Sequence, residues 1–269
     1  MARPRQRPPS HRKPIPDRAA PSAATPRHGL ARVISKLGAA SRTQAAKWIG
    51  EGRVTVNGRV AHDPEMPIDA TCDRIAVDGA EISARERIYL MLNKPRGYVT
   101  TTSDERGRDT VYALLEGSGL PWLAPVGRLD KASEGLLLLT NDSVWAARIT
   151  APDTELDKTY HVQIDRLPDA ALLAALHAGI DDRGERLAVK SVRELRRGDR
   201  NAWLEIVLDE GRNRQIRRLL AAFDIAVLRL VRIAVGAVSL GTLAKGAWRT
   251  LDPDEIRALQ IASDTSQRG

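Results

Sequence analysis

The segment from Gly127 to Asp142 holds the densest group of residues that could do chemistry. It reads Gly-Arg-Leu-Asp-Lys-Ala-Ser-Glu-Gly before the apolar run Leu136–Leu139 and an Asn-Asp turn. A charged loop that enters an apolar strand can hold the carboxylate of Asp130 against a pocket with little freedom, which suits a nucleophile or an acid–base group. The alternative is that Asp130 only caps a turn and that Arg128 pairs with an acid on the surface.

A second constellation lies in residues 209–220, which read Asp-Glu-Gly-Arg-Asn-Arg-Gln-Ile-Arg-Arg-Leu-Leu. The apolar residues share one face at helical spacing, which predicts a helix within 213–223. On that helix Arg214 and Arg218 fall opposite the apolar face, where they could meet solvent or phosphate. Arg217 falls on the flank and can turn into a cleft beside the core.

Several other chemistries are disfavoured by motifs that the sequence lacks. The five histidines include no pair at ligand spacing, and the one cysteine, Cys72, cannot build an internal disulfide or a cysteine-rich metal site. The sequence contains no glycine-rich phosphate loop, no dinucleotide fingerprint and no Gly-x-Ser-x-Gly elbow. We therefore expect a reaction that needs no metal, nucleotide or bound organic cofactor.

The composition indicates a soluble protein with a basic N-terminal arm. Hydrophobic residues make up 42% of the 269 residues and charged residues 28%, enough for one large domain or two ordinary ones. No apolar run is long enough for a membrane span, and no signal peptide is apparent, so we expect a cytoplasmic protein. Residues 1–27 hold seven basic groups, one acid and seven of the fifteen prolines. We predict a disordered arm there, which either attracts nucleic acid or only improves solubility.

Residues 28–83 have the pattern of a small module in which two helices precede a sheet. A short helix is predicted at Leu30–Leu37, and Ser41-Arg42-Thr43-Gln44 has the form of a capping box that opens a second helix. The alternating segment Val54–Val60 contains Asn-Gly, a strong hairpin signal, and a further strand is predicted at 74–77.

The charge of this module is polarised. Residues 28–62 hold six basic groups and one acid, whereas residues 63–83 hold six acids and one arginine. Such a surface indicates nucleic-acid binding, unless it is an ordinary solvated helix face. The stretch Leu30–Gly79, with its Leu-Gly, Ser-Arg, Gly-Arg-Val and Val-Asn-Gly sequences, resembles an S4-type domain and so implies binding of structured RNA. On this resemblance we expect RNA contacts at Lys36, Ser41, Arg42 and Arg53.

Residues 84–87 form a polar joint, and the rest of the chain alternates strand-like and helix-like stretches. The predicted strands are 88–92, 136–139, 160–164, 187–192 and 203–208, and the predicted helices are 142–149, 168–178, 213–223 and one that starts at Asp252. We expect an α+β domain with a mixed sheet over residues 88–260, followed by a flexible tail over 261–269.

Three motifs in order resemble those of bacterial ribosomal RNA pseudouridine synthases. They are Gly-Arg-Leu-Asp-x-x-Ser-x-Gly-Leu-Leu-Leu-Leu-Thr-Asn-Asp from residue 127, Lys-Thr-Tyr from residue 158, and Glu-Gly-Arg-Asn-Arg-Gln-Ile-Arg-Arg from residue 210. With the preceding module, they resemble the branch that carries an S4-type domain, and they look closest to enzymes for large-subunit 23S rRNA. The resemblance covers residues from Leu30 to Leu259 and implies a mixed, largely antiparallel sheet flanked by helices.

The resemblance also assigns roles to single residues. It implies that Asp130 is the catalytic aspartate, which attacks the target uridine at the uracil ring or at the sugar. Arg217 matches the arginine that faces this carboxylate and favours its charged form in a dry pocket. Tyr160 matches the tyrosine that lies against the uracil and assists loss of the proton at carbon 5.

The remaining matches concern the RNA. Arg128 matches the arginine associated with flipping the nucleotide, and Lys158 is grouped with it as a substrate contact. Arg214 and Arg218 are expected as outward-facing RNA contacts, and no metal site is expected.

Three hypotheses follow. The first is an rRNA pseudouridine synthase, for 23S rRNA or alternatively for 16S rRNA. The second is a non-catalytic RNA-binding or ribosome-assembly protein on the same scaffold, and the third is an unrelated hydrolase that uses Asp130 with Glu134. The matches at the catalytic positions favour the first. We expect a monomer that acts without a cofactor on rRNA or on a ribosomal subunit precursor during ribosome biogenesis.

Overall fold

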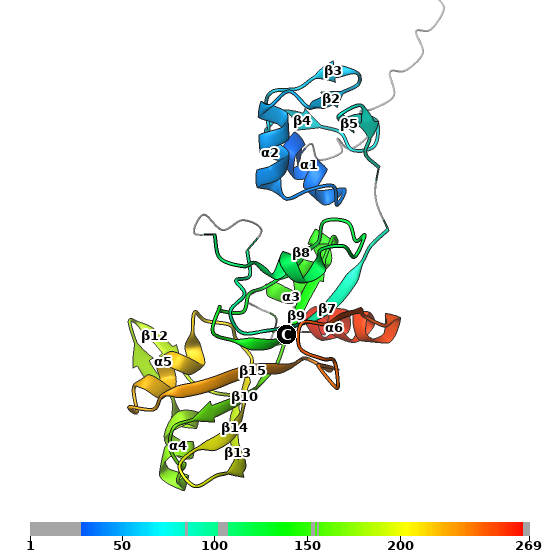
Figure 1. Cartoon of the computed structure of the whole chain (residues 1–269). Helices are drawn as coiled ribbons and strands as arrows, with labels where there is room; N and C mark the ends of the chain where they lie inside the picture. Colours follow the sequence, from blue (N-terminus) through cyan, green and yellow to red (C-terminus); the bar gives the residue numbers. More distant parts are fainter. Residues whose placement is uncertain (1–27, 84–85, 102–106, 152–153, 155, 266–269) are drawn as a thin grey trace, which may run out of the picture.

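The computed structural model contains two domains joined by a short segment (Figure 1). It describes residues 28–83, 86–101, 107–151, 154 and 156–265. The predicted basic arm, residues 1–27, lies outside these described residues, as do the last four residues of the predicted tail. No helix in the described part of the chain is long and apolar enough to cross a membrane.

The N-terminal domain packs two helices on a small sheet (Figure 1). The helices are α1 (Leu30–Lys36) and α2 (Arg42–Gly50), and the sheet has the order β3-β2-β5-β6. Its strands are β2 (Val54–Val56), β3 (Arg59–Val60), β5 (Ile75–Val77) and β6 (Ala80–Glu81), and a separate pair joins β1 (His28–Gly29) to β4 (Pro67–Ile68). One apolar cluster fills the space between the helices and the strands.

Local sequence signals explain where helix α2 begins and where the first hairpin of this domain turns. The Ser41 hydroxyl accepts a hydrogen bond from the backbone N–H of Gln44 (3.0 Å) and caps α2, as predicted. The hairpin between β2 and β3 turns at Asn57 and Gly58, whose φ values are +51° and +79°. Two consecutive residues with positive φ are what a type I′ turn requires, and the Asn-Gly pair adopts them at low cost.

The C-terminal domain is built on a mixed sheet with the strand order β13-β14-β10-β15-β9-β7-β17, to which β8 adds at β9 and β16 at β15. The strands are β7 (Tyr89–Lys94), β8 (Ala124–Val126), β9 (Glu134–Thr140), β10 (Lys158–Ile164), β13 (Ser191–Arg197), β14 (Ala202–Leu208), β15 (Val227–Val235), β16 (Val238–Ser239) and β17 (Trp248–Thr250). The pair β9 and β15 is parallel, and the other neighbouring pairs are antiparallel. The predicted mixed, largely antiparallel sheet is therefore confirmed.

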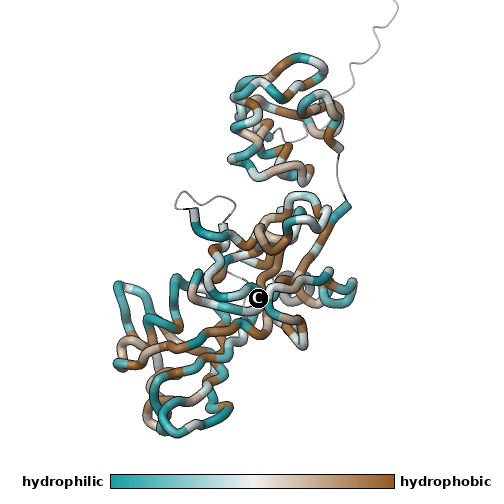
Figure 2. The backbone as a smooth tube through the Cα atoms, in the orientation of Figure 1, coloured by the Kyte–Doolittle hydropathy of each residue, from teal (hydrophilic) through white to brown (hydrophobic). Residues whose placement is uncertain are grey.

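Helices cover this sheet differently at its two ends. They are η1 (Val111–Leu115), α3 (Ser143–Thr150), α4 (Ala170–Ala178), α5 (Gln215–Ala221) and α6 (Pro253–Thr265). At the β7–β9 end α3 and α6 cover one face and η1 the other, so every residue of β9 is buried. At the β13–β14 end α4 and α5 pack on one face. Hydrophobic residues accordingly follow the central strands, and hydrophilic residues follow the outer loops (Figure 2).

The joint between the domains is fixed to the end of β9. The side-chain amide of Asn141 accepts a hydrogen bond from the N–H of Ile88 (2.8 Å) and donates one to the carbonyl oxygen of Glu86 (2.8 Å). Strand β9 therefore connects the loop that contains Asp130 to the segment that carries the N-terminal domain.

One predicted strand is wrong in its extent. The segment 187–192 belongs to two strands, β12 (Glu185–Leu187) and β13. The reason is that β12 folds back on β11 (Ile180–Asp182) through a tight turn in which residues 183 and 184 both have positive φ. An apolar pattern alone does not show this break, because Leu187, Val189 and Val192 continue it.

The last helix also extends further than predicted. Helix α6 continues to Thr265, past residue 260, where we placed the end of the catalytic domain. No glycine or proline interrupts the sequence between Pro253 and Gly269, so nothing in the residue types stops the helix earlier. The other predicted strands and helices of this domain coincide with observed elements to within about two residues at each end.

Gly135, at the parallel pairing of β9 with β15, leaves no room for a side chain. Its φ is +101°, and an added Cβ would lie 2.2 Å from the carbonyl oxygen of Arg232. Gly135→Ala should therefore lower the free energy of unfolding by about 3 kcal/mol, through backbone strain and a clash with backbone atoms. Gly97→Ala is the matched control, since Gly97 has a φ of +102° with nothing within 4 Å of its added Cβ. Urea unfolding of both variants measures the difference, and equal losses would contradict the steric role of the β9–β15 contact.

Candidate active site

A cavity of about 850 Å³ lies between the loop before β9, strands β10 and β15, and the segment that leads into α5. This position follows from the sheet order, because β15 pairs with β10 on one side and with β9 on the other. Segments far apart in the sequence therefore meet at one place. The predicted site residues that line the cavity are Arg128, Asp130, Lys158, Tyr160, Arg214 and Arg217.

Lys94, a buried lysine at the end of β7, forms hydrogen bonds that hold the loop that carries Asp130. The Lys94 ammonium, 0% exposed, donates hydrogen bonds to the carbonyl oxygens of Pro95 (3.0 Å), Asp130 (3.1 Å) and Ser133 (2.8 Å). Burial lowers the pKa of Lys94 to about 8, and the nearby charges of Asp130 and Glu134 oppose that shift. Lys94 is a positioning residue. The sequence Asn-Lys-Pro-Arg-Gly resembles the family's turn after the first strand, from which we expected a structural rather than a catalytic role for Lys94–Gly97.

Further hydrogen bonds fix the same loop from the side. The Thr100 hydroxyl donates to the carbonyl oxygen of Leu129 (2.8 Å) and accepts from its N–H (3.3 Å). The N–H of Gly97 donates to the carbonyl oxygen of Lys131 (2.8 Å). The backbone on both sides of Asp130 is thus constrained, while its carboxylate, 37% exposed, remains open to the cavity.

Arg214 is the arginine that pairs with Asp130. Its Nη1 lies 3.4 Å from Oδ2 of the carboxylate. We predicted that Arg214 points away from the core on a regular helix, and this is wrong. Helix α5 begins only at Gln215, and Arg214 precedes it in the left-handed conformation (φ +50°), so helical spacing does not apply to its side chain.

Arg217 lies in the first turn of α5 and lines the cavity, as its predicted flanking position suggested. Its Nη2 donates to the carbonyl oxygen of Ala132 (3.1 Å) and its Nη1 to that of Val227 (3.4 Å). Its Nε is buried without a hydrogen-bond partner in the described structure. Burial and then the charge of Arg214 lower the pKa of Arg217, against the opposing effect of Asp130. No hydrogen bond or ion pair joins Arg217 to Asp130 among the described contacts.

Arg218 does not face solvent, and the prediction of an outward RNA contact is wrong for it. Its guanidinium, 15% exposed, pairs with Asp182 (2.5 Å) and Glu185 (2.6 Å). These acids lie on the hairpin of β11 and β12, which folds over the side of α5 that helical spacing left open. Because the acids precede Arg218 by more than thirty residues, local spacing gave no sign of the contact.

Lys158 and Tyr160 project from the same face of β10, because they are two residues apart on a strand. The Lys158 ammonium donates to the carbonyl oxygen of Asp209 (2.9 Å), and burial lowers its pKa. Opposite Tyr160 on β15 lies Arg232, a buried residue whose Nε donates to the carbonyl oxygen of Leu136 (2.8 Å). We did not predict Arg232 for the site, although its place among alternating apolar residues of β15 was a signal.

Glu134 does not join Asp130 in an acid pair. Its side chain is 3% exposed, pairs with Arg229 (3.0 Å) and Lys245 (2.6 Å), and does not line the cavity. The pair of Asp130 with Glu134, on which the hydrolase hypothesis depends, is therefore not formed. No group of three or more histidine, cysteine or acidic residues in the described chain could hold a metal ion.

We predicted four RNA-contact residues in the N-terminal domain, and two of them have no described hydrogen-bond or ion-pair partner. Lys36 and Arg42 are exposed. The Ser41 hydroxyl caps α2, and Arg53 forms two hydrogen bonds with Asp78 (2.9 and 2.5 Å) while lying 5.4 Å from the Trp48 ring. Arg53 can thus act on RNA only with part of its guanidinium or after leaving Asp78.

Comparison with known families agrees with this division. Residues 88–222 match the family model described as RNA pseudouridylate synthase, and residues 29–75 match the S4 domain. Both matches lie within the domains that the structure separates.

Similar proteins extend the match over most of the chain. An uncharacterised RNA pseudouridine synthase of Aquifex aeolicus is 37% identical over 230 residues, which is 85% of this chain and 92% of that protein. Ribosomal large subunit pseudouridine synthase B of Bacillus subtilis is 34% identical over 238 residues, 87% of this chain and 96% of that protein. A crystal structure of a pseudouridylate synthase is 33% identical, covers 87% of this chain and 100% of that chain, and has a TM-score of 0.59. The chain therefore belongs to the family of RNA pseudouridine synthases and carries an S4 domain before its synthase domain.

Proposed function

We propose that this protein converts a uridine of large-subunit ribosomal RNA to pseudouridine, with Asp130 as the nucleophile. The observation that carries the proposal is the Asp130 carboxylate, which faces the cavity from a loop fixed by Lys94 and pairs with Arg214. The similarity to a B. subtilis enzyme named for the large ribosomal subunit favours 23S rRNA over 16S rRNA.

The reaction exchanges one bond for another within a single nucleotide. Asp130 attacks the flipped uridine at the ring or the sugar, the bond between N1 and C1′ breaks, and the uracil rotates. Carbon 5 then bonds to C1′, and the bond between Asp130 and the nucleotide breaks, which restores the free carboxylate. Carbon 5 loses its proton and N1 gains one, so the balance needs no oxidant or reductant. Tyr160 lies against the uracil and assists the loss of the carbon 5 proton.

The cationic lining of the cavity suits a nucleotide. Extruding a base costs a few kcal/mol, which contacts with the flipped nucleotide must offset. Arg128, Lys158 and Arg214 line the cavity and provide charges for the neighbouring phosphates. The volume of about 850 Å³ lies within the range of small-molecule sites and is large enough for one nucleotide.

The S4 domain provides the second part of the RNA contact. Lys36 and Arg42 are exposed in its helices and can bind phosphates of structured RNA. We place the enzyme in the cytoplasm as a monomer acting on rRNA or a ribosomal subunit precursor. A non-catalytic RNA-binding protein on this scaffold would have no need for a carboxylate fixed in a cationic cavity.

Asp130→Asn should abolish pseudouridine formation, because the amide cannot act as the nucleophile. We expect turnover to fall by about 10³-fold or more. RNA affinity should stay within about threefold, since the carboxylate contributes no phosphate contact. Chemical mapping of pseudouridines in rRNA transcripts measures the first quantity, and filter binding the second. The exposed acid of α6 gives the control Asp254→Asn, and full activity of Asp130→Asn would refute the proposed mechanism.

Arg214→Ala and Arg217→Ala should each lower kcat by about 10²-fold, because each removes a guanidinium next to the reacting carboxylate. Rapid-quench measurements under single-turnover conditions separate this loss from RNA binding, which should change only a few-fold. Arg183→Ala, on the exposed tip of the β11–β12 hairpin, is the control arginine. A defect of Arg217→Ala confined to RNA affinity would make Arg217 a phosphate contact instead.

Lys94→Met should lower kcat while KM stays unchanged, because the Asp130 loop loses two hydrogen bonds but the RNA contacts remain. Since its pKa is about 8 in the folded protein, against 10.5 ordinarily, the ammonium loses its proton as the pH rises through 8. The wild-type kcat should therefore fall above that pH, and Lys94→Met should lack this decline. Lys131→Met, an exposed lysine of the same loop, is the control. A rise in KM alone, or equal pH profiles, would contradict the positioning role.

A further inference from the structure

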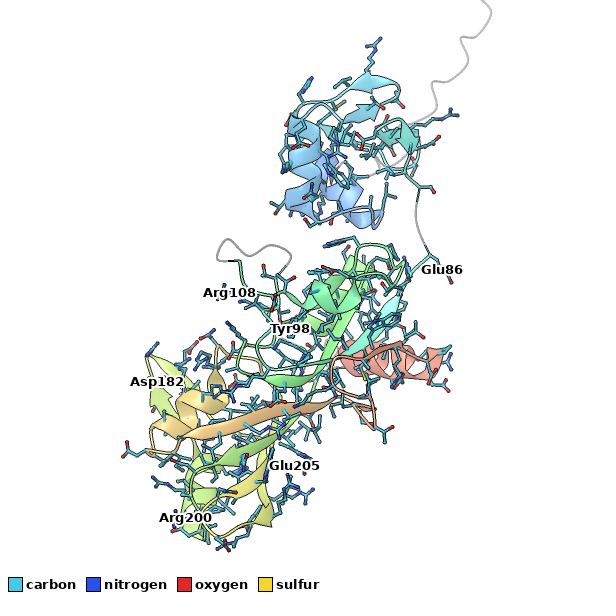
Figure 3. All side chains as sticks on the ribbon, viewed as in Figure 1. Glu86, Tyr98, Arg108, Asp182, Arg200 and Glu205 are labelled. Carbon is cyan, nitrogen blue, oxygen red and sulfur yellow. The ribbon has the colours of Figure 1, made fainter. Side chains whose placement is uncertain are left out.

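The face of the sheet opposite the cavity is open along strands β13, β14, β10 and β15. In β14 the even-numbered residues are buried under α4 and α5, whereas Trp203, Glu205 and Val207 are partly exposed on the other face. Their neighbours across the strands, among them Arg193 and His161, are also partly or fully exposed. Glu205 lies on the side of these strands away from α4 (Figure 3). We call this the back face.

One row of the back face combines an indole ring with two guanidinium groups. Arg196, Trp203, Gln163 and Arg229 lie opposite one another on the four strands. The Cζ of Arg196 lies 4.6 Å from the centre of the Trp203 ring, and the Cζ of Arg229 lies 5.5 Å from it. The ring attracts both cations, which favours guanidinium positions next to Trp203 on the open face.

The second row is mixed in charge, and the face as a whole is cationic. Arg193 and His161 both contact Glu205 (2.7 and 3.3 Å). At the edge of the face Arg229 and Lys245 share the buried carboxylate of Glu134. The back face therefore carries four cations, Arg193, Arg196, Arg229 and Lys245, against two carboxylates.

Arg196 is the residue of the back face best placed to bind an anion. Arg193, Arg229 and Lys245 each pair with a carboxylate, whereas the Arg196 guanidinium has the Trp203 ring as its only described partner. An arginine that stacks on a ring keeps the hydrogen-bond donors at its edge available for phosphate oxygens.

We propose that the back face is a second RNA-binding surface, which binds the phosphate backbone of a double-helical segment away from the target uridine. This inference rests on the proposed function only in taking structured RNA as the substrate. Phosphate is the complementary charge, and Arg196 and Arg229 present two guanidinium groups beside the same ring, so together they can meet neighbouring phosphates.

The contacts of the Trp203 ring favour double-helical RNA over single-stranded RNA as the ligand of the back face. Proteins that bind single strands stack bases on open aromatic rings. The Trp203 ring is occupied by the two guanidinium groups, so little of it is left for a base. Double-stranded RNA is recognised through phosphates and shape, which needs no open ring.

The test compares two charge reversals at exposed arginines. Arg196→Glu changes the back face, and Arg257→Glu makes the same change of net charge on α6, at the far end of the domain. Filter binding at several salt concentrations with an RNA duplex and with single-stranded poly(U) gives the affinities. Both residues are exposed, so the substitutions should leave the fold intact, and thermal unfolding of each variant verifies this. Arg196→Gln, which removes the charge without reversing it, is a milder second variant.

We expect Arg196→Glu to weaken duplex binding by about five- to tenfold and to reduce the slope of log affinity against log salt by about one. Arg257→Glu should change the duplex affinity by no more than about twofold and leave the slope unchanged. Binding of poly(U) should be nearly unchanged by Arg196→Glu. Equal effects of the two reversals on the duplex would overturn the proposal, as would no effect of either, which would leave an acidic protein as the occupant. An equal loss for poly(U) would overturn the assignment to double-helical RNA. Because binding needs no turnover, these results are independent of whether Asp130 is the nucleophile.

Discussion

The ammonium of Lys94 holds the Asp130 loop in place, and the geometry of the cavity follows from that contact. Burying a lysine costs several kcal/mol, which charge-assisted hydrogen bonds to carbonyl oxygens offset at about 1.5–3 kcal/mol each. Lys94 forms three of them, two with the loop, at Asp130 and Ser133, and one with Pro95. The antiparallel pairing of β7 with β9 sets Lys94 opposite Gly135, directly beside the end of the loop. A cation in the core therefore replaces the hydrogen bonds that a strand or helix would give this stretch of backbone.

Three arginines at the start of α5 have different roles although they are close in sequence. Arg214 pairs with the carboxylate of Asp130, Arg217 donates to carbonyl groups on two other segments, and Arg218 joins the helix to the β11–β12 hairpin. The planar guanidinium has five donors in fixed directions, which lets it bridge groups that a lysine would bind one at a time. The short helix α5 is thereby connected to the Asp130 loop, to β15 and to the hairpin.

Local signals predicted the α-helices and seven of the strands, but not the nine-residue strand β15, the helix η1 or the short strands β8, β16 and β17. The cap at Ser41, the Asn-Gly hairpin and the apolar strand before Asn141 depend on neighbouring residues, and the structure has each of them. The family motifs predicted that Asp130, Tyr160 and Arg217 belong to one site, and all three line the cavity. The pairing of Arg214 with Asp130 was missed because Arg214 precedes α5 in the left-handed conformation, and the contacts of Arg218 were missed because its acids lie on a distant hairpin.

Strand β9 begins at the Asp130 loop and ends at the joint held by Asn141. It is buried on both faces and paired on both edges, so its length cannot change without loss of the core. Seven residues of strand span about 20 Å. The place where the N-terminal domain is attached thus has a constant separation from the Asp130 loop. An RNA that binds the S4 domain must bring its uridine across that distance, so choice of the target is in part a selection for RNA geometry rather than for sequence.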